Sequence, residues 1–171
     1  METNPRAPAR LVPAAILAVG LAALGTALVA QFGFGLQPCH LCLIERVPYG
    51  VAAILAAVAL AHRTARVRRT LVGLCAAAFA INAMIAFYHV GVEHHWWKAA
   101  TCDTSTAQDS GAALTIEALN RAIEHPHEVP CDVVQWSLFG LSIAGYNGLA
   151  SLALAFACAG AVLRSQWWGK T

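Results

Sequence analysis

The chain has 171 residues, of which 58% are hydrophobic and 12% are charged, and its mean hydropathy is +0.59. This length leaves room for one domain, residues 1–171, and so apolar a composition excludes an ordinary soluble one. The apolar residues must therefore face lipid, and no nucleic-acid partner is expected.

The first predicted element is a membrane-spanning helix at residues 11–30, close to the ~20 residues that cross the hydrocarbon core of a bilayer. The alternative is a cleaved signal peptide, because Arg6 and Arg10 precede the segment and small residues follow it. The apolar run is longer than the ~7–15 residues of a signal-peptide core, which favours a retained helix.

A CxxC motif lies at the boundary between the first connection, residues 31–41, and a second predicted span at residues 42–61. Pro38 precedes Cys39, and proline is typical of a helix's first turn. Cys42 is then predicted near the positive end of a helix dipole, which favours a thiolate. Arg46 follows four residues later on the same helical face. At a separation of ~6 Å and a dielectric of ~20, its charge would stabilise a Cys42 thiolate by up to ~3 kcal/mol.

Arg46 also has a purely structural interpretation, because an arginine at the end of a span can extend to the lipid headgroups. Glu45 beside it is a candidate for an exposed ion-pair partner, which would contribute little. His40, inside the CxxC motif, is expected to be exposed.

A third span is predicted at residues 70–90, and a long second connection follows at residues 91–142. Connections longer than about 12 to 15 residues usually serve a purpose. This one holds Cys102 and Cys131, which would form either a structural disulfide or a redox pair. Between them, the pattern at 110–124 predicts a short amphipathic helix, lying in the membrane interface or packed on its own loop.

The fourth span is predicted at residues 143–163. Cys75 and Cys158 fall inside the third and fourth spans and are interpreted as small, inert hydrophobic residues. The predicted fold class is thus an all-α membrane protein, a bundle of four transmembrane helices with two outer loops.

The charges indicate the orientation of this bundle. Eight of the eleven basic residues lie in the N-terminal tail, the link after the second span and the C-terminal tail: Arg6, Arg10, Arg63, Arg66, Arg68, Arg69, Arg164 and Lys170. By the positive-inside rule these segments and both termini are cytoplasmic. The four cysteines outside the third and fourth spans then lie on the oxidising, outer side, where disulfides form.

A protein that repeatedly regenerates a disulfide needs an electron acceptor. The sequence contains no recognisable binding motif for flavin, haem or nucleotide, because no GxGxxG motif stands at the start of a helix and no histidine follows the CxxC motif. The remaining class of acceptor is a lipid-soluble quinone that reaches the site through the bilayer. Arg46 would favour the negative charge that develops on such a quinone.

The motif P-C-x-L-C-x-x-E-R, from Pro38 to Arg46, resembles the DsbB family of disulfide bond formation proteins, as do the surroundings of Cys102 and Cys131 and the tract 136–141. This resemblance spans nearly the whole chain. It implies a multi-pass protein of the bacterial inner membrane that reoxidises a periplasmic DsbA-like dithiol oxidase and passes two electrons to ubiquinone or menaquinone. In this way it would support disulfide formation in exported proteins.

The resemblance also implies roles for individual residues. Cys39 and Cys42 would be the pair next to the quinone, Cys42 being the thiolate that meets it and Arg46 the residue that assists. Cys102 and Cys131 would be the pair exposed to the DsbA-like partner. Of the remaining positions, the resemblance assigns three to the quinone site: His89, Ile143 and Tyr146.

Two other classes of function compete with this interpretation. One is a metal-binding membrane protein that uses the four outer cysteines with some of His89, His94 and His95 as ligands. The other is a tetraspan scaffold with two structural disulfides. The acidic, histidine-rich part of the second connection departs from the family pattern and leaves open which partner binds.

Overall fold

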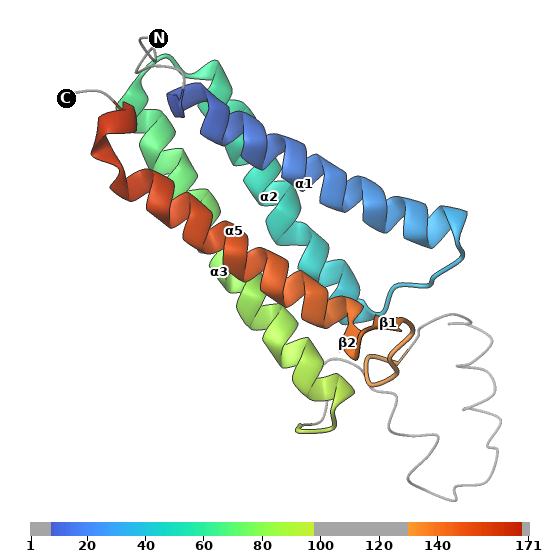
Figure 1. The fold of residues 1–171 in the computed structure, drawn as a ribbon. Helices are drawn as coiled ribbons and strands as arrows, with labels where there is room; N and C mark the ends of the chain where they lie inside the picture. The colour runs from blue at the N-terminus through green and yellow to red at the C-terminus, as the bar shows by residue number, and fades with distance from the viewer. Residues whose placement is uncertain (1–7, 98–129, 169–171) are drawn as a thin grey trace, which may run out of the picture.

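The computed structural model describes residues 8–97 and 130–168. These residues form four long helices, α1 (Pro8–Gly33), α2 (His40–Ala61), α3 (Ala65–Glu93) and α5 (Ile143–Leu163), and a short 3-10 helix η1 (Ser165–Trp168). Each of the four is long and apolar enough to cross a membrane. Figure 1 shows them packed side by side, which confirms the predicted four-helix bundle.

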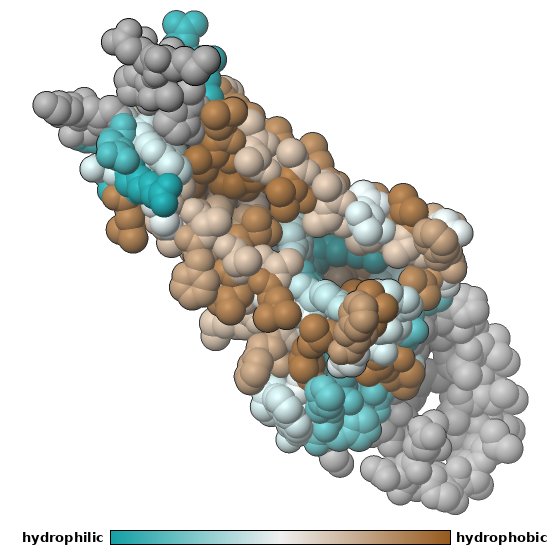
Figure 2. All heavy atoms as spheres, in the orientation of Figure 1, coloured by the Kyte–Doolittle hydropathy of each residue, from teal (hydrophilic) through white to brown (hydrophobic). Residues whose placement is uncertain are grey.

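The helices pack through small side chains. α3 packs against both α2 and α5, while α1 packs mainly on α2. Gly20 of α1 lies where an added Cβ would be only 3.3 Å from the Ala53 Cβ and from the Tyr49 carbonyl oxygen. Close approach of this kind is the usual basis of helix packing in lipid, where dispersion contacts replace the hydrophobic effect. Many of the large apolar side chains instead point outward, as the brown surface in Figure 2 shows, while a few such as Phe79 and Val72 fill the core.

One end of the bundle is basic, and two of its arginines satisfy helix carbonyl groups. Arg68 is buried and donates to the carbonyl oxygens of Ala59 and His62, at the end of α2. Arg69 Nε donates to the Val162 carbonyl at the end of α5, over 3.0 Å. The last carbonyl groups of a helix lack partners within it and attract cations. The link after α2 therefore stabilises helix ends as well as carrying charge.

At the opposite end a small hairpin precedes α5. Its strands are β1 (Ser137–Leu138) and β2 (Leu141–Ser142), paired antiparallel. The turn places Phe139 and Gly140 at φ 51° and φ 79°, in the left-handed region that favours glycine. The sequence did not predict this hairpin. The expected amphipathic helix at 110–124 and Cys102 lie outside the described residues.

Candidate functional site

The CxxC motif forms the beginning of α2, as predicted. Cys39 is the N-cap residue, with extended backbone angles (φ −73°, ψ 170°), and its Sγ accepts the backbone N–H of Cys42 over 3.3 Å. The first N–H groups of a helix have no partner within it, so an anionic sulfur is stabilised here. Cys39 is 3% exposed, whereas Cys42 is half-buried.

The two sulfurs lie 2.9 Å apart as a hydrogen-bonded dithiol. The hydrogen bond to Cys42 lowers the pKa of Cys39 to about 4, with help from His89 and the Cys42 backbone N–H and against the opposing effect of burial. In this geometry the thiolate is therefore at Cys39, which differs from the expectation that the helix dipole acts mainly on Cys42. The main reason is the hydrogen bond between the two sulfurs, and the Cys42 N–H that Cys39 receives as the cap residue adds to it.

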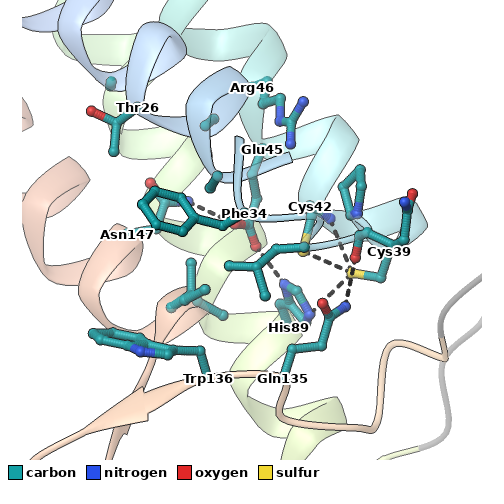
Figure 3. Close-up of a pocket in the computed structure, with 18 of the residues that line it drawn as sticks. Thr26, Phe34, Cys39, Cys42, Glu45, Arg46, His89, Gln135, Trp136 and Asn147 are labelled. Atoms are coloured by element: carbon teal, nitrogen blue, oxygen red, sulfur yellow. Dashed lines mark hydrogen bonds and ion pairs between the residues drawn. The ribbon is translucent and has the colours of Figure 1, made fainter. Parts of the chain in front are cut away.

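His89 of α3 reaches the dithiol from the side. Its Nε2 is 3.6 Å from Cys39 Sγ, and its Nδ1 is 2.8 Å from Glu45 Oε1. Both side chains are almost fully buried. Figure 3 shows this chain of contacts running from Cys39 through His89 to Glu45. The structure thus brings His89 to the CxxC pair, and Glu45 orients it.

The expected exposed ion pair between Glu45 and Arg46 is wrong. Glu45 is 6% exposed and turns inward, where its Oε2 accepts a hydrogen bond from Asn147 Nδ2 over 2.7 Å. Arg46 instead donates from Nη1 to Gln31 Oε1 of α1, also over 2.7 Å. Neighbouring helix residues differ by about 100° in direction, so one faces α3 and α5 while the other faces α1.

A polar network continues from Glu45 toward the middle of the bundle. Asn147 Oδ1 accepts the Tyr49 hydroxyl over 2.8 Å, and Asn82 Nδ2 donates to Ser151 Oγ over the same distance. Polar groups inside a membrane bundle are costly unless they are paired, and they often mark functional sites. Glu45 and Asn147 were missed as site residues. Their polarity within otherwise apolar spans was the signal that could have identified them.

A pocket of about 730 Å³ lies beside this network, with α1 and α5 as walls. Cys39, Cys42, Arg46 and His89 all line it, and so does Ile143. Figure 2 shows an opening between brown surfaces with teal at its bottom, where polar residues lie. Among the described residues, Tyr146 is not part of the lining, because its hydroxyl donates to the Leu138 carbonyl over 3.0 Å and braces the hairpin.

Cys131 packs beside the CxxC motif. It is 1% exposed, disulfide-bonded, and belongs to the same buried cluster as Cys39, Leu41 and Val92. Its expected partner, Cys102, lies outside the described residues. Cys75 and Cys158 are free thiols in the core of the bundle, as predicted. His94 and His95 are exposed beyond α3, apart from the described cluster of Cys39, Cys42 and His89.

These features define a multi-pass helical protein with a CxxC dithiol at the edge of an apolar pocket. The sequence model of the family "Disulfide bond formation protein DsbB" matches residues 9–161. The chain belongs to this family. It is therefore a multi-pass membrane protein with a role in disulfide bond formation.

Curated relatives agree with this assignment. The chain is 28% identical over 137 residues to "Disulfide bond formation protein B" of Methylobacillus flagellatus, covering 77% of this chain and 79% of the relative. It is 26% identical over 150 residues to the protein of the same name in Stutzerimonas stutzeri, covering 82% and 86%. For the Polaromonas protein the identity is 25% over 156 residues, covering 90% and 88%. No solved structure matches the chain significantly.

Proposed function

We propose that this protein reoxidises a periplasmic DsbA-like dithiol oxidase and passes the two electrons to membrane quinone. The observation that carries the proposal is the position of Cys39 and Cys42, which stand at the start of a membrane-spanning helix and line a largely apolar pocket. A dithiol that only stabilised a loop would not need such a pocket.

The pocket residues fit a quinone. A volume of about 730 Å³ lies within the roughly 300–1,000 Å³ typical of small-molecule sites. Most of the lining surface is apolar, and Arg46 and His89 are two of the polar residues that contribute to it. A bound quinone would supply a two-electron, two-proton acceptor. Arg46 would hold negative charge there, while Ile143 would form part of the apolar wall.

The chain's own residues would carry the exchange in series. The partner's dithiol attacks the disulfide formed by Cys102 and Cys131, and the resulting thiols reduce the disulfide of Cys39 and Cys42. Each transfer moves two electrons, and the overall reaction converts a partner dithiol and a quinone into a partner disulfide and a quinol. The packing of Cys131 in one buried cluster with Cys39 supports this order.

The His89–Glu45 pair supports the proton side of the reaction. Formation of the Cys39–Cys42 disulfide releases the proton that the Cys42 thiol still holds, and His89, whose ring nitrogen lies within 4.8 Å of both sulfurs, offers an acceptor. Glu45, 2.8 Å from Nδ1, would stabilise the imidazolium that forms.

The test uses the purified protein in detergent with a reduced thioredoxin-fold partner and quinone. Loss of quinone absorbance should depend on both. Replacing Cys102 or Cys131 by serine should abolish oxidation of the partner while quinone still oxidises Cys39 and Cys42. If the Cys39–Cys42 pair of these variants stayed reduced in excess quinone, the series order would be wrong, and if the intact protein consumed no quinone, the proposed acceptor would be wrong.

A further inference from the structure

Cys39, Cys42 and His89 form a compact group of soft ligands. The two sulfurs and a ring nitrogen of His89 all lie within 4.8 Å of one another. Figure 3 shows the three side chains converging from α2 and α3 at the pocket. Thiolate and imidazole are the ligands that zinc-like ions prefer, and three such ligands leave one tetrahedral position for water.

We propose that the reduced CxxC pair, together with His89, is a binding site for one thiophilic divalent cation of the Zn²⁺ and Cd²⁺ type. The chemistry is a Cys₂His site whose fourth position faces the pocket. Binding displaces the remaining thiol proton of the pair and any proton on His89 Nε2, and no electrons are transferred. The two thiolates then neutralise the charge of the ion.

The distances are close to those of a tetrahedral site. Metal–sulfur and metal–nitrogen bonds of about 2.3 and 2.05 Å place sulfur and nitrogen ligands about 3.6 Å apart and two sulfurs about 3.8 Å apart. The observed separation of Cys39 Sγ from His89 Nε2 is 3.6 Å, and that of the two sulfurs is 2.9 Å. The sulfurs must therefore separate by roughly 0.9 Å. This requires a rotation of the Cys42 side chain, which is half-buried and lines the pocket.

The residues around Cys39, Cys42 and His89 also resemble the second coordination shell of a protein metal site. Glu45 Oε1 lies 2.8 Å from His89 Nδ1, so a hydrogen bond there leaves the Nε2 lone pair free to face the sulfurs. A carboxylate behind a ligating histidine fixes the ring and increases its basicity. Asn147 in turn holds the other oxygen of Glu45 over 2.7 Å. The backbone N–H that Cys39 accepts stabilises a ligating thiolate in the same way.

The site exists only while the pair is reduced, because a disulfide offers no thiolate. A bound ion would hold Cys39 and Cys42 apart and reduced, so it would block the exchange proposed above. That consequence rests on the proposed function, whereas cation binding itself does not. A binding measurement therefore tests the cation site separately from the proposed function. The protein could reduce quinone without binding the cation, and it could bind the cation without reducing quinone.

The experiment titrates the reduced protein with Cd²⁺ under argon and follows the sulfur-to-cadmium charge-transfer band. Cys102 and Cys131 are replaced by serine so that they contribute no thiols. We expect one Cd²⁺ per chain and no binding to the oxidised protein. His89→Gln should weaken binding at least about tenfold, and Glu45→Gln by roughly 10- to 100-fold. His40→Gln is the matched control, because His40 is exposed inside the same motif, and it should bind as the parent does.

Cadmium-113 NMR of the parent protein provides an answer even if His89→Gln does not fold. A chemical shift typical of two sulfur donors and one nitrogen donor supports the site. A sulfur-only shift, equal affinities of the His89→Gln and His40→Gln proteins, or equal binding by the oxidised chain would each overturn it.

Discussion

At the scale of single residues, the environment of Cys39 distinguishes the two cysteines of the CxxC motif. Both cysteines line the pocket, but Cys39 caps α2, receives the Cys42 N–H and lies 3.6 Å from His89, whereas Cys42 lies within the first turn and is half-buried. A stabilised thiolate leaves its disulfide more readily, because a thiol of low pKa is the better leaving group. Cys39 is therefore suited to be the sulfur released when an incoming thiolate attacks Cys42.

The first prediction concerns the acid titration of Cys39. Its ordinary pKa of 9.0 is lowered to about 4, so the reduced protein should keep one thiolate down to about pH 4. Between these values the unfolded chain holds one more proton than the folded chain, so this group stabilises the reduced fold at high pH, and the contribution is lost as pH falls toward 4. Thiolate absorbance of the reduced protein lacking Cys102 and Cys131 measures this. Cys39→Ser should remove the transition, and a midpoint near 9.0 would contradict the assignment.

The second prediction concerns Arg46. Substitutions of this residue distinguish electrostatic assistance to the quinone from simple anchoring at the lipid headgroups. Arg46→Gln keeps a polar side chain but removes a charge that lines the pocket. We expect weaker apparent quinone affinity and a turnover lower by roughly ten- to a hundredfold, for about 1.4 to 2.8 kcal/mol lost. Arg46→Lys should recover part of the charge effect but little of a forked hydrogen bond.

The turnover and the apparent quinone affinity of both Arg46 variants are measured from quinone reduction kinetics at matched protein levels. Arg66→Gln, an exposed arginine at the basic end of the bundle, is the control and should keep the parent rate. A normal rate for Arg46→Gln would show that Arg46 acts only as an interfacial anchor through its bond to Gln31.

The sequence could single out Cys39, Cys42 and Arg46 as candidates because they lie in one short motif. It could not predict the Glu45–His89 pair, because these residues are 44 positions apart and on different helices. Their meeting depends on the rotation of α2 relative to α3. Nothing in the local pattern of either helix fixes that angle, which follows from packing of small side chains across the bundle.

At the scale of elements, the start of α5 links three parts of the site. Ser142 is the N-cap, and its Oγ accepts the Gly145 backbone N–H over 3.1 Å. The same hydroxyl donates to Glu93 Oε2 at the end of α3 over 2.5 Å. Ile143 and Asn147 follow within the first turns, so the cap positions both the pocket wall and the partner of Glu45.

The third prediction is that Ser142→Ala lowers the free energy of unfolding by about 1 kcal/mol, the usual effect of losing an N-cap side chain. Thermal unfolding in detergent measures this, with Ser142→Thr as a control that keeps the hydroxyl. Equal melting temperatures for the alanine and parent proteins would show that the hairpin alone fixes the start of α5.

The helices themselves were predictable because lipid requires long apolar segments. The predicted bounds were short at both ends of α3, 70–90 against Ala65–Glu93, because arginines and a glutamate continue the helix beyond the apolar run. The hairpin was not predictable in the same way. Each of its strands has two residues, too few to show an alternating pattern.

At the scale of the whole molecule, the arrangement of the ends agrees with one orientation in the membrane. The start of α1, the link between α2 and α3, and η1 lie together at one end, and the CxxC motif and the hairpin lie at the other (Figure 1). An even number of spans returns the chain to its starting side. The basic residues of the link and of the end of α5 therefore share a face with the N-terminal side of α1.

The fourth prediction places this basic end in the cytoplasm. Reporter fusions at Arg66 and at the C-terminus should give cytoplasmic signals, and a fusion near Ser110 should give a periplasmic signal. Arg68 and Arg69 are poor sites for such fusions because they bond to the ends of α2 and α5. A periplasmic signal at Arg66 would reverse the orientation and place the CxxC motif on the reducing side.

The opening of the pocket on the flank of the bundle, between α1 and α5, determines how its occupancy should be counted. A ligand that enters there is delivered by the lipid phase, so the relevant quantity is its mole fraction among lipids, not its amount per litre of buffer. Adding empty micelles at constant total quinone should therefore slow the reaction, as dilution does in solution. Rates measured in different detergents become comparable only when they are expressed per lipid or detergent molecule.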